Sequence, residues 1–114
     1  MANDSHATYA QRLIEAVLNS PGDTEPSIRQ AAEALSAQPG GRPSSQTDAI
    51  PPELISYVKK IALHAYKTTD EDIEALRKAG YSEDAIFEIT VSAALGAGMA
   101  RLERGLAALK SDEE

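Results

Sequence analysis

The chain has 114 residues, no cysteine, no tryptophan and a formal net charge of −7. A single domain is expected at this length, and an acidic chain without a Lys/Arg cluster is unsuited to nucleic acid or anionic membranes. The lack of cysteine excludes disulfides, thiolate metal ligands and cysteine nucleophiles.

Residues 1–11 contain neither a basic stretch nor an apolar run of the kind that begins a secretory signal. The apolar runs of the chain are also shorter than the roughly 20 residues that span a membrane. We therefore expect a cytoplasmic protein without a membrane partner.

Residues 1–37 are predicted to form an N-terminal helical pair. The first helix, over about 5–19, is ended by Ser20-Pro21-Gly22, because proline lacks an N–H and glycine suits a C-cap. The second begins at Pro26 and ends near Ala37. Its apolar stripe is weaker and consists of Ile28, Ala31, Ala32 and Leu35. This pair is too short to hold a core, so we expect it to pack on the rest of the chain or on a neighbouring subunit.

Residues 38–50 contain two prolines and two glycines and are predicted to be a linker. A helical core is expected over 51–110, followed by an acidic tail at 111–114. Its first helix opens at Pro51-Pro52-Glu53. The apolar stripe of that helix is Leu54, Val58, Ile61 and Ala65.

Local signals divide the rest of this core into two segments, and the first of them, Thr68 to Gly80, either merges with the third helix or forms a new one, which gives four or five helices in all. Thr69 and Asp72 resemble a capping box at the start of one helix, and Gly80 provides its C-cap. Ser82 caps the last helix, which is expected to reach beyond Leu109.

The last helix carries small residues four apart, which allow another helix to approach closely. One row is Ser92, Gly96 and Ala100, and another is Ala94 and Gly98. Packing inside the monomer and a subunit interface both explain them, and we expect the 91–101 face and the third helix to lie near subunit contacts.

Glu53, Tyr57 and His64 follow one another at spacings of four and seven, so they lie near one helix face, with Lys60 beside them. A carboxylate, a phenol and an imidazole in one cleft could perform acid–base chemistry. The alternative is structural: Glu53 favours a helix N-terminus, Tyr57 packs, and His64 caps or is exposed.

No metal or cofactor site is predicted. His6 lies near the terminus and His64 is alone on its helix. Asp70, Glu71 and Asp72 are consecutive, so they point around a helix and do not converge on one ion. The sequence contains no phosphate-binding loop or dinucleotide fingerprint.

Two short motifs carry a family resemblance. Residues 79–84 read Ala-Gly-Tyr-Ser-Glu-Asp, and residues 86–89 read Ile-Phe-Glu-Ile. With the sequence from Glu53 to Leu109 around them, they resemble the AhpD-like/carboxymuconolactone decarboxylase family. The resemblance implies an all-α helical bundle with an antiparallel helix pair, and a homo-oligomer that is a trimer or hexamer.

The family's redox signature has a glutamate, two cysteines and a histidine before this turn. In this sequence those positions fall on Glu53, Ala65, Thr68 and Asp72, so only the glutamate is kept. Thiol peroxidase chemistry needs a thiolate and is excluded.

We therefore expect an oligomeric AhpD-like helical protein without the redox centre, which binds a small molecule or a partner. The alternative is a cofactor-free lyase or hydrolase of the carboxymuconolactone decarboxylase type, acting on a small organic acid. In that case Glu53 and His64 would form the acid–base pair, with Tyr57 and Lys60 orienting the substrate.

Overall fold

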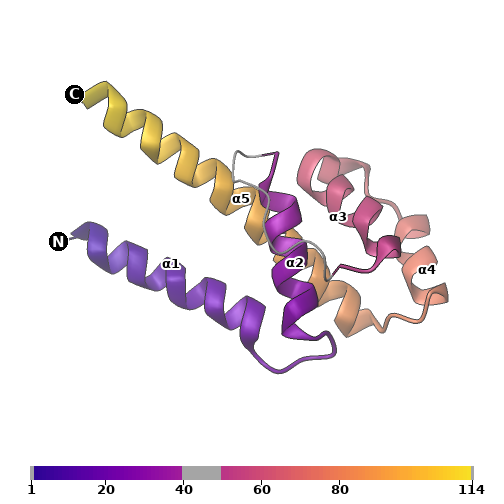
Figure 1. Cartoon of the computed structure of the whole chain (residues 1–114). Helices are drawn as coiled ribbons and strands as arrows, with labels where there is room; N and C mark the ends of the chain where they lie inside the picture. Colours follow the sequence, from indigo (N-terminus) through magenta and orange to yellow (C-terminus); the bar gives the residue numbers. More distant parts are fainter. Residues whose placement is uncertain (1, 40–49, 114) are drawn as a thin grey trace.

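The structure is a computed structural model that describes residues 2–39 and 50–113. Most of the predicted linker and the side chains of His6 and the 111–114 tail lie outside the described residues. The described part is all-α, as predicted, and has five helices and one 3₁₀ turn (Figure 1). The helices are α1 (Ala2–Asn19), α2 (Pro26–Ala37), α3 (Pro52–His64), α4 (Asp70–Lys78) and α5 (Glu83–Glu113).

The core lies where α2 crosses α5, with α3 and α4 packed beside them (Figure 1). The N-terminal pair thus packs on the rest of the chain, and the weaker stripe of α2 becomes central. Ala31 and Ala32 are fully buried, and Ile28 and Leu35 pack against the core. The other core residues are Ile50, Leu54, Tyr57, Val58, Leu76, Ile86, Ile89 and Ala93.

The first row of small residues on α5 serves packing within the chain. Ser92, Gly96 and Ala100 are all buried, and a Cβ added to Gly96 would overlap the backbone of Glu33 in α2. The second row differs, because Ala94 and Gly98 are exposed and nothing lies within 4 Å of a Cβ added to Gly98.

Local signals in the sequence account for the ends of α4 and α5. The capping box of Thr69 and Asp72 is complete, with each side chain bonded to the other residue's backbone N–H. Gly80 has a φ of 105°, a left-handed conformation that favours glycine. The Ser82 hydroxyl accepts a hydrogen bond from the Ala85 N–H at 3.0 Å.

The stripe predicted for α3 is wrong at its last residue. α3 ends at His64, and Ala65–Lys67 form a 3₁₀ turn in which Ala65 is exposed. The Arg101 guanidinium donates a hydrogen bond of 2.8 Å to the Ala62 carbonyl, so α5 satisfies part of this helix end.

A carboxylate on α5 holds the turn between α1 and α2. The backbone N–H groups of Asp23 and Thr24 donate to the Glu88 carboxylate at 2.9 and 2.8 Å. Burial raises the pKa of Glu88, but these hydrogen bonds and the nearby Arg29 charge outweigh it and lower the pKa overall. Arg29 is itself buried and donates to the carbonyls of Val17 and Ser20 at the end of α1.

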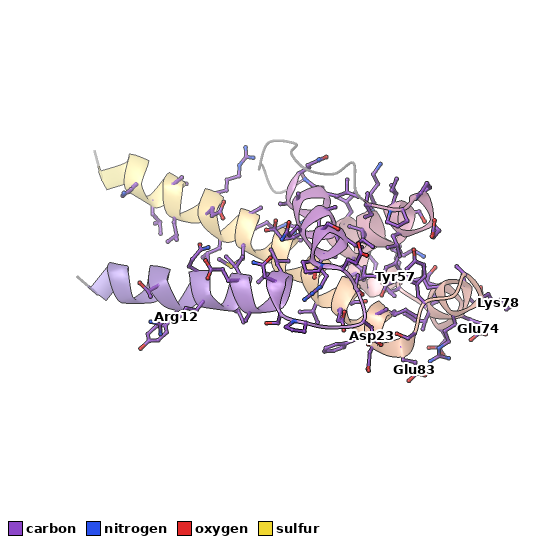
Figure 2. All side chains as sticks on the ribbon, turned by 60° about the horizontal axis from the view of Figure 1, so that its bottom comes forward. Arg12, Asp23, Tyr57, Glu74, Lys78 and Glu83 are labelled. Atoms are coloured by element: carbon purple, nitrogen blue, oxygen red, sulfur yellow. The ribbon has the colours of Figure 1, made fainter. Side chains whose placement is uncertain are left out.

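Two helical segments extend from this body in the same direction. α1 and the C-terminal half of α5 run side by side beyond α2, so both chain ends lie at one end of the molecule (Figures 1 and 2). The overall dimensions are 52 × 28 × 24 Å.

By length and composition alone, one helix in the described part of the chain, Glu83–Lys110 of α5, could cross a membrane. The sequence analysis missed this, because the many alanines of α5 raise its hydropathy without forming one long apolar run. In the structure 44% of the most apolar window is buried inside the protein, and core helices pass the same test.

Candidate functional site

The predicted acid–base residues lie at opposite ends of α3. Glu53 is in the first turn and His64 is the last residue, so they are roughly 16 Å apart along the helix axis. The spacing predicts a common face, but the two groups lie at opposite ends of the helix axis. Both side chains are exposed.

His64 lies beside the 3₁₀ turn, where its ring meets the Tyr66 ring edge-on at 6.0 Å. Of the two hollows described below, neither has His64 among its lining residues. The structure therefore brings Glu53, Tyr57 and Lys60 together without His64.

The first hollow is a polar pocket of about 100 Å³ between α3 and α4. Glu53, Tyr57 and Lys60 line it from α3, and Asp72 lines it from α4. The Lys60 ammonium bonds both oxygens of Asp72, at 3.0 and 2.8 Å. This bond, with the Thr69 backbone N–H, lowers the pKa of the Asp72 carboxyl. The two charged groups in the wall of this pocket, Lys60 and Asp72, thus already satisfy each other.

Glu53 is bonded to Tyr81, which lies 28 residues later in the sequence. The Tyr81 hydroxyl donates a hydrogen bond of 2.7 Å to the Glu53 carboxylate. This bond lowers the pKa of Glu53, whereas burial and the same bond raise the pKa of Tyr81 to about 12. Glu53 is therefore ionised at neutral pH and is a poor general acid.

The second hollow is an open groove of about 490 Å³ where α3, α4 and α5 meet. Its walls are mainly apolar, and its size lies within the range of small-molecule sites. The apolar lining residues are Ile61, Ala65, Ile73, Ile86 and Phe87. Phe87 is 68% exposed, so this large ring has little contact with the rest of the protein.

A few polar groups line this groove. The Thr68 hydroxyl is buried and has no hydrogen-bond partner. Thr90 donates to the Ile86 carbonyl at 2.7 Å, so the Tyr57 hydroxyl, 2.6 Å from the Thr90 oxygen, is the donor of that pair. Tyr57 therefore keeps a lone pair for another donor.

An ion pair lies at the rim of the groove. Arg77 of α4 donates to the Glu83 carboxylate at 2.6 Å, and both side chains are well exposed. Figure 2 shows Glu83 at the start of α5, at the end of the body near Asp23, with Tyr57 towards the centre. A charged group at the rim and an apolar interior suit a ligand with one polar end.

Sequence reasoning missed most of the polar contacts of these sites. Asp72 was assigned to the cap of α4, Tyr81 to the family motif, and Thr68 to a position of the family's redox signature, with no partner on another helix. Their partners lie on other helices, so no local pattern could identify them.

The described residues contain no group of three or more His, Asp or Glu side chains that could hold a metal ion. The chain matches no known protein family, and no curated protein or solved structure is significantly similar to it.

Proposed function

We propose that this protein binds a small, mainly apolar organic molecule in the groove between α3, α4 and α5. The observation that carries the proposal is the buried Thr68 hydroxyl, which lacks a partner beside a mainly apolar groove. A buried polar group without a hydrogen bond costs about 1–3 kcal/mol, and a rotation of the threonine side chain that brings this hydroxyl to a bound ligand removes that cost.

The groove favours a particular ligand chemistry. Isoleucine side chains and the exposed Phe87 ring suit an alkyl or aromatic body. The Thr68 hydroxyl suits a carbonyl or hydroxyl group, whereas the remaining lone pair of Tyr57 suits a hydroxyl group that donates to it. Arg77 is available to an anionic end if it exchanges Glu83 for the ligand, and that exchange costs little because the ion pair is exposed.

The test is a titration of the isotope-labelled protein with hexanol and with hexanoate, followed by backbone amide NMR shifts. We expect saturable shifts at Thr68, Ile73, Ile86 and Phe87 with either probe. Thr68→Val should weaken binding several-fold and Thr68→Ser should retain it. Shifts spread over the surface, or equal affinity of Thr68→Val and the parent, would contradict the proposal.

The enzyme alternative, a cofactor-free lyase or hydrolase on a small organic acid, has less geometric support. Glu53 and His64 do not share either of the two hollows described above, and Glu53 is already bonded to Tyr81. Glu53→Gln and His64→Ala must each abolish any such activity. Thiol peroxidase activity is excluded, because the chain has no cysteine.

An AhpD-like scaffold, a trimeric or hexameric assembly and a cytoplasmic location stay predictions. The all-α architecture agrees with the first of these. Sedimentation of the whole chain tests the second. The exposed leucines at the C-terminal end of α5 favour an even-numbered assembly.

A further inference from the structure

The C-terminal arm, residues 101–113 of α5, bears an apolar surface that the proposed ligand groove does not involve. All ten residues from Arg101 to Lys110 are exposed, including Leu102 (51%), Leu106 (55%) and Leu109 (61%). Five of the eight large apolar side chains exposed in the described residues lie on this arm or on α1. The two on α1 are Tyr9 and Leu13.

The arm leucines continue a heptad pattern. Leu95 and Met99 are half-buried against the body, and Leu102, Leu106 and Leu109 extend their row at alternating spacings of four and three. This is the spacing of the apolar seam of a coiled coil. A helix of such length that is exposed on every side is marginal in water by itself, so the stripe is suited to a second helix.

The dimensions of the protein also favour a partner at the C-terminal arm. Its radius of gyration is 15.0 Å, whereas a compact chain of this length has roughly 13 Å. α1 and the C-terminal arm extend to the same side of the molecule. A second copy can therefore approach that side without meeting the groove between α3, α4 and α5 (Figure 1).

Charge indicates which helix fits the arm. Residues 101–110 carry three basic residues and one acidic residue, whereas the chain ends in Asp-Glu-Glu and has a net charge of −7. An antiparallel pair of arms places the basic part of each beside the acidic end of the other and also aligns the helix dipoles favourably. A parallel pair would put like charges together.

Gly105 adds a steric argument for a close neighbour. Gly96 is explained by its contact with α2, but a Cβ on Gly105 would meet nothing within 4 Å in the isolated chain. A glycine inside an exposed helix costs about 1 kcal/mol relative to alanine. Near the middle of an antiparallel pair, Gly105 lets the two backbones approach.

We propose that two copies of this chain associate through their C-terminal arms as an antiparallel helix pair. Leu102 of one copy then packs between Leu106 and Leu109 of the other, and Gly105 lies near the two-fold axis. The contact is self-complementary, as a two-fold interface requires.

The test compares sedimentation of the full chain with Leu102→Gln/Leu106→Gln and with the control Ala107→Gln/Ala108→Gln, whose residues lie on the opposite side of the arm. At micromolar concentration the parent and control should sediment as even-numbered assemblies, and the leucine variant with half their mass. Circular dichroism separates this from unfolding, because the body helices remain. A monomeric parent, or a leucine variant of unchanged mass, would overturn the proposal.

Orientation is tested by single cysteines, since the chain has none of its own. Gly105→Cys should form an intermolecular disulfide, and Leu95→Cys should not. Crosslinking at both positions would indicate a parallel pair and contradict the antiparallel arrangement. A monomeric parent that binds anionic vesicles through the leucines would assign the stripe to a membrane. Thr68→Val should leave the assembly unchanged, so this proposal can fail independently of the ligand groove.

Discussion

Gly96 of α5 lies directly on the backbone of Glu33 in α2. A Cβ at position 96 would overlap the Glu33 carbonyl oxygen, which cannot move without shifting α2 itself. The contact lies at the centre of the fold, where fully buried Ala32 and Ala93 also belong to the core. The α2–α5 crossing therefore depends on the absence of a side chain at this position.

Replacing Gly96 with alanine should lower the free energy of unfolding by about 1–3 kcal/mol, because the overlap outweighs the gain in helix propensity. Gly98→Ala is the matched control, since that position is open, and it should stabilise by up to about 1 kcal/mol. Urea unfolding of both variants measures the difference. Equal stability of the two variants would show that α2 does not pack this closely.

Glu88→Gln should destabilise the protein by about 1–3 kcal/mol, because the Asp23 and Thr24 N–H groups lose a charged acceptor. Glu74→Gln, which removes only a long and exposed contact to Arg77, should change stability by less than about 0.5 kcal/mol. Thermal melting of the two variants tests this prediction. A larger loss in Glu74→Gln than in Glu88→Gln would refute it.

Acid should destabilise the fold through three carboxyl groups, Glu53, Asp72 and Glu88. Their pKa values are lowered from 4.5, 3.8 and 4.5. A lowered pKa contributes stability above the unfolded value and loses it as pH falls through the folded value. Unfolding free energies should therefore be level down to about pH 5 and fall below it. Glu88→Gln should show a shallower fall of stability below about pH 5, and an unchanged fall would contradict a stabilising role for the hydrogen bonds from Asp23 and Thr24 to Glu88.

The raised pKa of Tyr81 predicts a second loss of stability, at high pH. Its pKa is raised from 10.0 to about 12, so the stability from its neutral form is complete below pH 10.0 and is lost as pH rises to about 12. Tyr81→Phe should be less sensitive to pH across this window. Ultraviolet titration of tyrosinate should show one late-titrating tyrosine in the parent that is missing in the variant.

Thr69→Ala should cost about 1 kcal/mol of stability, because it removes the hydroxyl that accepts the Asp72 N–H. Thr69→Ser keeps the hydroxyl and should behave as the parent. Hydrogen exchange of the amides of α4 localises the effect. Equal protection in the alanine and serine variants would mean that the capping box contributes nothing.

Most helix boundaries could be predicted because their causes are local. Pro26, Thr69, Gly80 and Ser82 each act on the backbone within four residues, and each predicted end lies close to the observed one. The end of α3 was missed because no residue there stops a helix, and Arg101 reaches Ala62 from α5.

The candidate sites could be predicted only in part. Glu53 and Tyr57 do line one pocket, but helix spacing alone could not show the axial distance to His64. The decisive contacts join residues far apart in the chain, such as Glu53 with Tyr81 and Glu88 with Thr24. Composition contains no information about such pairings.

The crossing of α2 and α5 also constrains how the chain folds during its synthesis. A ribosome makes the N-terminus first, at about 5–20 residues per second. Some sixty residues separate Ala37 from Gly96. Translation of the part of α5 that packs on the alanine face of α2 is therefore completed roughly 3–12 s after α2 itself. During that interval the apolar residues of α2 have no partner to pack against, so chaperones that bind exposed apolar segments are suited to shield them.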